Sequence, residues 1–178
     1  MNRDYFAEMY VAGVLADAGW HVYFPRRDQG FDFIVTKAVG DQIVIRPVQV
    51  KGKYPTDGKG DRQVYGYMGR LSQVQPDMVL AVPFFATEVH AAPMFTAYLP
   101  PTQLRRSPSR ESWYRVFPAG FSEGTPYMRP SYTRFFDTEG IRLMESSSWS
   151  AQPVVASTPD EDAEGGESAA GAAVTHTG

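Results

Sequence analysis

The fold is decided by residues 31–51, which read FDFIVTKAVGDQIVIRPVQVK. The runs on either side of Gly40 and Asp41 are rich in β-branched and aromatic residues, which favour strands. Gly-Asp between two such runs is typical of a tight hairpin turn. We therefore predict one strand over residues 31–37 and a second over residues 42–51, paired antiparallel.

The register of this hairpin is expected to bring polar residues together. A two-residue turn pairs residues whose numbers add up to 81, so that Asp32 lies opposite Gln49. Directly paired residues place their Cβ atoms about 4.5–5.5 Å apart on one face, and the two-residue period adds Lys51 to that face. A four-residue loop gives the same register, whereas a three-residue loop would break it. The alternative interpretation is an ion pair of Asp32 with Lys51 at a strand end.

The segments before and after the hairpin predict an α/β domain. Apolar residues surround most of a helix expected over residues 4–18, which Gly19 ends. The other elements expected before residue 83 are a strand at 20–24, a mobile loop at 52–61, a short helix at 62–73 and a buried strand at 78–82.

The rest of the chain has a different composition. Eight prolines between Pro83 and Pro130 exclude a long helix there, so short strands, turns and brief helices are expected. The end of the chain is rich in Ala, Gly, Ser and acids, and such a segment cannot bury enough surface to fold. We predict one domain over residues 1–148 and a disordered acidic tail over 149–178.

Composition excludes several classes of function. The chain of 178 residues has no cysteine, which excludes disulfides, thiolate metal sites and a cysteine nucleophile. It has no apolar run long enough to cross a bilayer and no signal-peptide layout, so a cytoplasmic protein is expected. Five of the 20 acids lie in residues 151–178, which have no Lys or Arg, and the remaining 15 face 17 basic residues. The body therefore tolerates a polyanion.

Glu8 occupies an unusual position in the predicted helix. On a helical wheel it lies within about 60° of Val11, Ala12 and Leu15, and therefore on the apolar face. A buried carboxylate without a partner costs several kcal/mol, so a metal ion, a cation or local water is expected beside Glu8. The alternative is that Glu8 bends outward or pairs with an arginine.

Together these residues resemble the PD-(D/E)XK nuclease superfamily, in its branch of Mrr-type restriction endonucleases and archaeal Holliday-junction resolvases. The resemblance rests on the helical Glu8, on Asp32 at the start of the hairpin and on VQVKGK at residues 48–53, and it covers residues 3–85. It implies a restriction-endonuclease-like core, in which an N-terminal helix, an antiparallel hairpin, a helix and a further strand build a central mixed sheet. A Pro-rich C-terminal half follows here.

The resemblance also implies a site and an activity. Asp32 corresponds to the metal-binding aspartate, Lys51 to the motif lysine and Glu8 to an acidic residue of the first helix. Gln49 stands where the family most often has Glu, and a neutral amide should weaken the binding of a hard cation. The implied activity is Mg²⁺- or Mn²⁺-dependent endonucleolytic hydrolysis of DNA. The alternative is a catalytically inactive nuclease fold that binds nucleic acid or a protein partner.

The chemistry of phosphodiester hydrolysis suits these residue types. Mg²⁺ prefers oxygen ligands, which Asp32, Gln49, the Val50 carbonyl and Glu8 could supply, while Lys51 would orient the attacking water. Cutting both strands of a duplex is simplest with two copies of one site, so a homodimer fits this activity. Basic residues near the site are predicted to contact DNA phosphates, although each could also be an ordinary surface charge; they are Arg26, Arg27, Lys53, Lys59 and Arg62.

Overall fold

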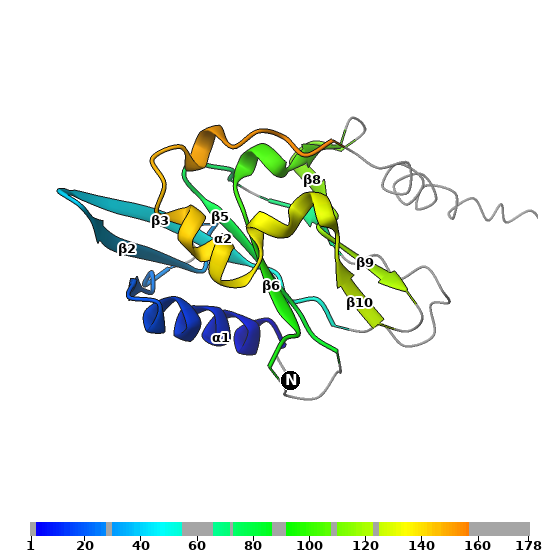
Figure 1. Ribbon diagram of the computed structural model, residues 1–178, viewed down its shortest axis with the longest axis horizontal. Coiled ribbons are helices and arrows are strands. Elements are labelled where there is room, and N and C mark those ends of the chain that lie inside the picture. Colours follow the sequence, from blue (N-terminus) through cyan, green and yellow to red (C-terminus); the bar gives the residue numbers. More distant parts are fainter. Residues whose placement is uncertain are drawn as a thin grey trace, which may run out of the picture.

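The computed structural model describes residues 3–27, 30–54, 66–71, 73–86, 92–107, 110–122 and 125–156. These residues form an α/β fold around a five-stranded mixed sheet (Figure 1). No described helix combines the length and the apolar character needed to cross a lipid bilayer.

The chain begins with helix α1, Arg3–Asp17. Its Val11 and Leu15 side chains are fully buried, as the apolar face of the wheel predicts. The helix ends at Gly19, whose φ of +85° is a conformation that favours glycine. The Trp20 amide donates to the Leu15 carbonyl at 3.0 Å and so closes the last turn. The predicted helix and its end are confirmed.

The central sheet has the order β1-β2-β3-β5-β6. Strands β3 and β5 run parallel, whereas the other neighbours are antiparallel. The hairpin of β2 and β3 extends beyond the other strands (Figure 1). The five strands are β1 (His21–Tyr23), β2 (Phe33–Val39), β3 (Gln42–Val50), β5 (Val79–Phe84) and β6 (Phe95–Leu99).

The hairpin has the predicted register. Its pairs run from Val39 with Gln42 to Phe33 with Val48, so every pair of numbers adds up to 81. Gly40 in the turn has a φ of +58°. Strand β2 begins two residues later than predicted, but the ladder continues beyond it, because the Asp32 amide donates to the Val48 carbonyl at 2.8 Å.

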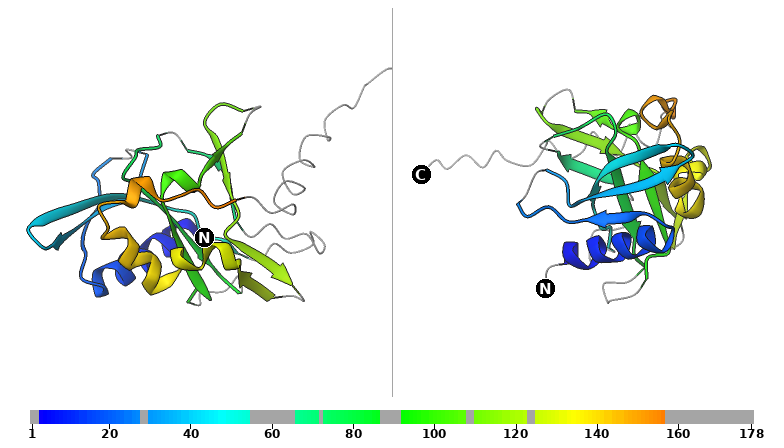
Figure 2. Two further views of the ribbon diagram at one scale, coloured as in Figure 1. Left: turned by 45° about the horizontal axis from the view of Figure 1, so that its top comes forward. Right: turned by 90° about the vertical axis from the view of Figure 1, so that its left-hand side faces the viewer.

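The two faces of the central sheet are covered differently. On one face α1 and α2 pack against residues such as Val79 and Ala81 (Figure 2). On the other face Leu80 and Val82 pack against Tyr67 and against a three-stranded sheet of order β4-β8-β7. The remaining elements are β4 (Tyr67–Arg70), η1 (Pro101–Gln103), β7 (Arg105–Arg106), β8 (Trp113–Val116), β9 (Ala119–Ser122), β10 (Thr125–Met128), η2 (Pro130–Phe135), α2 (Asp137–Met144) and η3 (Trp149–Ala151).

The segment between β3 and β5 differs from the prediction. The prediction of a helix within residues 62–73 is wrong for the described part of this range. Residues Tyr67–Arg70 form strand β4, which pairs with β8. Residues 62–65 and most of the predicted loop, residues 55–61, lie outside the described residues. The expectation for the Pro-rich half is confirmed, since its described elements are short strands, brief 3₁₀ helices and the eight-residue helix α2.

Residues after 148 belong to the packed structure, which corrects the predicted start of the tail. Trp149 is fully buried and its indole nitrogen donates to the Met78 carbonyl at 3.0 Å. Gln103 donates to the Pro153 carbonyl at 2.8 Å. The buried aromatic ring and the hydrogen bonds together anchor this segment. Residues 157–178 lie outside the described residues.

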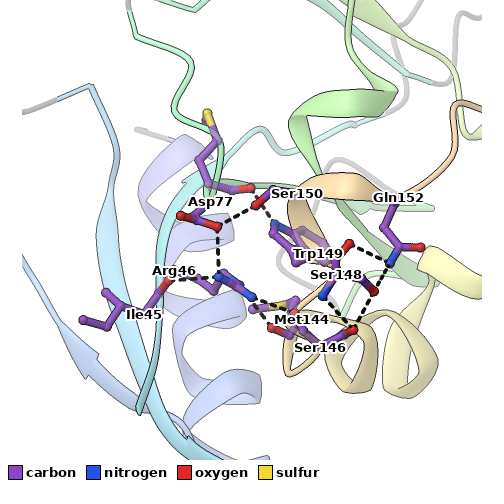
Figure 3. A network of polar contacts seen from close by, with 10 residues as sticks. Ile45, Arg46, Asp77, Met144, Ser146, Ser148, Trp149, Ser150 and Gln152 are labelled. Carbon is purple, nitrogen blue, oxygen red and sulfur yellow. Dashed lines mark hydrogen bonds and ion pairs between the residues drawn. The ribbon is translucent and has the colours of Figure 1, made fainter. Parts of the chain in front are cut away.

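A polar network around Arg46 attaches this C-terminal segment to the sheet (Figure 3). Arg46 is only 6% exposed, and it donates to the carbonyl oxygens of Met144 at 3.1 Å and Ser146 at 3.0 Å. It also pairs with Asp77 at 3.3 Å, and Asp77 in turn accepts from Ser150. Burial lowers the pKa of Arg46, and the charge of Asp77 opposes that effect. The guanidinium thus links β3, the turn before β5 and the segment at the end of α2.

Candidate functional site

The site begins at the open end of the β2–β3 hairpin, where Asp32 and Gln49 meet. The Gln49 side-chain amide donates to Asp32 Oδ2 at 2.9 Å. The Val50 backbone amide donates to the same oxygen at 2.6 Å. Hydrogen bonds to an ionised carboxylate are stronger than those between neutral groups, so Asp32 is held in one position. The predicted cross-strand contact of Asp32 with Gln49 is therefore present.

A pocket of about 720 Å³ opens over this pair. Glu8, Asp32, Gln49 and Lys51 all line it, although they come from a helix and two different strands. Gln49 is buried, while the other three side chains are partly buried. The structure thus brings together the four side chains that the sequence singles out for chemistry.

Close packing of α1 against the end of β3 places Glu8 near Lys51. The chain keeps its sheet contacts after Val50, because the Lys51 amide donates to the Ala81 carbonyl at 2.9 Å. At Gly52 an added Cβ would lie 3.0 Å from the Cβ of Ala7, the neighbour of Glu8. The absence of a side chain at residue 52 therefore lets the helix approach the strand.

Cationic side chains dominate the pocket wall. Arg26 and Arg27, from the loop after β1, line the pocket together with Lys51, as does Arg70 at the end of β4. All three arginines are exposed. Four cations therefore accompany the two carboxylates of Glu8 and Asp32, an excess of positive charge that suits a phosphate-bearing ligand.

Arg70 is a lining residue that the sequence interpretation missed. Its backbone is held by Tyr67, whose hydroxyl donates to the Arg70 carbonyl at 3.0 Å. The Tyr67 ring lies over Gly69, where an added Cβ would be 2.9 Å from the hydroxyl oxygen. Burial raises the pKa of Tyr67 to about 12, so the hydroxyl keeps its proton at neutral pH. The signal for Arg70 in the sequence was the spacing of Tyr67 and Gly69, which lie two residues apart in the strand.

Not every predicted site residue lines the pocket. Val50 contributes its amide to Asp32, and its side chain is buried in the hydrophobic core; the ligand role of its carbonyl stays a prediction. Lys53 does not line the pocket, and burial lowers the pKa of its ammonium group. Lys59 and Arg62 lie outside the described residues.

The donor set is suited to a hard divalent cation. The described residues contain no group of three or more His, Cys, Asp or Glu side chains that could hold a metal ion. The pocket instead offers carboxylates from Glu8 and Asp32 and the amide oxygen of Gln49. Mg²⁺ is commonly bound through one or two carboxylates and keeps several water molecules, so these residues fit Mg²⁺.

No protein-family profile matches this sequence, and no curated protein sequence matches it.

Proposed function

We propose that this protein is a metal-dependent endonuclease that hydrolyses phosphodiester bonds of DNA. The observation that carries the proposal is the meeting of Glu8, Asp32, Gln49 and Lys51 in one pocket whose wall also carries three arginines. Oxygen donors for a cation, an ammonium group and phosphate-binding side chains are the parts that this reaction uses.

The arrangement of elements supports the same proposal. Helix α1, the hairpin of β2 and β3, and the parallel strand β5 follow one another in the order of a restriction-endonuclease-like core. The second helix of that core is not found among the described residues between β3 and β5, where β4 joins another sheet. The fold assignment to this family is therefore part of the proposal.

Each residue has a distinct role in this proposal. Mg²⁺ bound by Glu8 and Asp32 would polarise the phosphate and acidify a water molecule. Lys51 orients the attacking water and stabilises charge on the phosphate. Gln49 positions Asp32 through their 2.9 Å hydrogen bond. Arg26 and Arg27 bind neighbouring phosphates.

One observation favours the alternative of a non-cutting nucleic-acid-binding protein. Asp32 Oδ2 already accepts two hydrogen bonds, from Gln49 and Val50. Two carboxylates at these positions would repel each other without a cation, whereas an aspartate and an amide are stable together. A pocket of this kind keeps its geometry without a metal ion.

Cleavage assays distinguish the two functions. Supercoiled, linear, single-stranded and branched DNA are incubated with Mg²⁺ or Mn²⁺ and either wild-type protein or Asp32→Asn. We expect metal-dependent cleavage of at least one form by the wild type and none by Asp32→Asn. Tight DNA binding without cleavage of any form would favour the binding function.

Two further expectations belong to this proposal. A homodimer would supply two copies of the site for the two strands of a duplex, and sedimentation velocity measures that state directly. A cytoplasmic location fits a DNA substrate and also remains a prediction.

A further inference from the structure

Phe31 occupies a position that the catalytic proposal does not use. It lines the pocket beside Asp32 and is only partly buried. Neither of the two hydrophobic clusters formed by the described residues includes Phe31. An aromatic side chain that does not contribute to a described core, in a pocket otherwise rich in charge, is available to a ligand.

The surroundings of Phe31 indicate what kind of ligand this is. Pro25 and Leu71 provide further apolar wall, and Arg27 and Arg70 provide cations. Proteins that bind single-stranded nucleic acid combine a positively charged groove for the backbone with aromatic side chains on which bases stack. The pocket contains both parts within one volume of about 720 Å³.

An intact duplex cannot use Phe31 in this way. Bases in a duplex are paired and stacked, so a side chain inside a pocket reaches the face of a base only when the nucleotide is unpaired. The volume of the pocket lies within the range of small-ligand sites, about 300–1,000 Å³, which admits one nucleotide. The phosphates of a duplex can contact the cations of the pocket, but its paired bases do not reach Phe31.

We propose that the pocket binds an unpaired nucleotide of single-stranded DNA, with its base on Phe31 and its phosphates between Arg27 and Arg70. This inference rests on the proposed function for the identity of the polymer, and it specifies the substrate as a single strand or the unpaired part of a branched one. Phe31 and Arg70 are positioning residues, because they act on the substrate away from the reacting phosphate.

Equilibrium binding tests the inference without any cleavage. The probes are a labelled 20-nucleotide single strand and the duplex of the same sequence, both in EDTA. Because stacking of a base on an aromatic ring is lost, Phe31→Ala should weaken binding of the single strand about 5- to 100-fold. Its affinity for the duplex should stay within about twofold, and Phe31→Tyr should restore single-strand binding. Equal losses for the two probes, or no loss for the single strand, would overturn the proposal.

Phe24 serves as the matched control for Phe31, and Arg106 serves as the matched control for Arg70. Phe24 is 53% exposed and does not line the pocket, so Phe24→Ala should leave single-strand affinity within about twofold. Arg70→Gln should weaken single-strand binding and reduce the slope of log K against log salt by about 0.7. Arg106 lies in the same small sheet and outside the pocket, so Arg106→Gln should leave that slope unchanged. A slope that responds equally to both arginine substitutions would contradict a specific role for Arg70.

The outcomes for binding and for cleavage are separable. Phe31-dependent binding of single strands in a protein that cuts no DNA would refute the proposed function and leave this inference standing. Metal-dependent cleavage by a protein that binds single strands equally well with and without the Phe31 ring would refute this inference and leave the proposed function standing.

Discussion

At the scale of single residues, the contact of Asp32 with Gln49 holds the carboxylate that we propose as a metal ligand. Gln49 Nε2 donates to Asp32 Oδ2 at 2.9 Å. This hydrogen bond stabilises the carboxylate in part, as a bound cation otherwise would. A glutamate at residue 49 would have no proton to donate.

Gln49→Glu should therefore make folding depend on metal. In EDTA we expect a loss of about 1–3 kcal/mol in the free energy of unfolding, from two adjacent carboxylates and a lost hydrogen bond. Mg²⁺ should restore the lost stability. It should also bind to the variant at least as tightly as to the wild type, because the substitution adds a negatively charged ligand. Thermal unfolding with EDTA or Mg²⁺ measures both effects. Identical melting of variant and wild type in both buffers would contradict this account.

The sequence was sufficient to predict this contact and insufficient to predict Arg70. The partners of the hairpin are close in the chain, and a two-residue turn leaves one register that keeps the apolar face buried. Arg70 reaches the pocket because β4 pairs with β8, far along the chain. Local patterns contain no information about such a pairing.

At the scale of elements, the approach of α1 to the end of β3 positions Glu8. An added Cβ at Gly52 would lie 2.9 Å from the Tyr54 ring and 3.0 Å from Ala7. The Tyr54 ring is itself stacked on Phe85, with centroids 4.3 Å apart, so it has little room to move.

Gly52→Ala should accordingly push the helix away from the strand. We expect a loss of about 1–3 kcal/mol in the free energy of unfolding, which is typical of overpacking, together with weaker Mg²⁺ binding. Gly13 is the matched control, because nothing lies within 4 Å of a Cβ added there in α1. Gly13→Ala should stabilise the protein by about 0.5–1 kcal/mol. Denaturant unfolding and calorimetry provide the two readouts, and a neutral Gly52→Ala would refute the close-packing argument.

The strand β4 illustrates why the sequence predicted the wrong element there. Residues 62–73 contain Gly66 and Gly69, which weaken both helix and strand propensity. An added Cβ at Gly66 would lie 2.3 Å from the Val116 carbonyl, so this glycine serves the close approach of a distant segment. Contacts with a distant segment of the chain therefore determined that Tyr67–Arg70 forms a strand.

At the scale of the whole molecule, the described structure includes residues up to Ala156, and the acidic residues of the predicted tail come later in the sequence. Trp149 is fully buried, and the Val155 amide donates to Gln103 at 3.0 Å. The start predicted for the tail, residue 149, is too early, because composition does not show that Trp149 is buried.

Two truncations separate these parts. A chain that ends at Ala156 should keep its melting temperature within about 2 °C of the full chain. A chain that ends at Ser148 lacks Trp149, and its free energy of unfolding should fall by about 3–5 kcal/mol. The shorter deletion also removes five acids, so DNA binding should tighten at low salt and return to the wild-type value at high salt. Equal stability of the two truncated chains would refute the corrected boundary.

We propose that the pocket of Asp32 and Lys51 cuts DNA, and the Lys51→Ala variant tests this activity. Lys51→Ala removes the ammonium group that acts on the attacking water but only one of several phosphate contacts. Single-turnover cleavage and equilibrium binding of the same DNA are measured with Mg²⁺ for wild type and Lys51→Ala. We expect cleavage to fall at least about 100-fold, while the affinity for DNA changes less than about threefold. Cleavage that survives the substitution unchanged, or a wild type that cuts none of the four DNA forms, would contradict it.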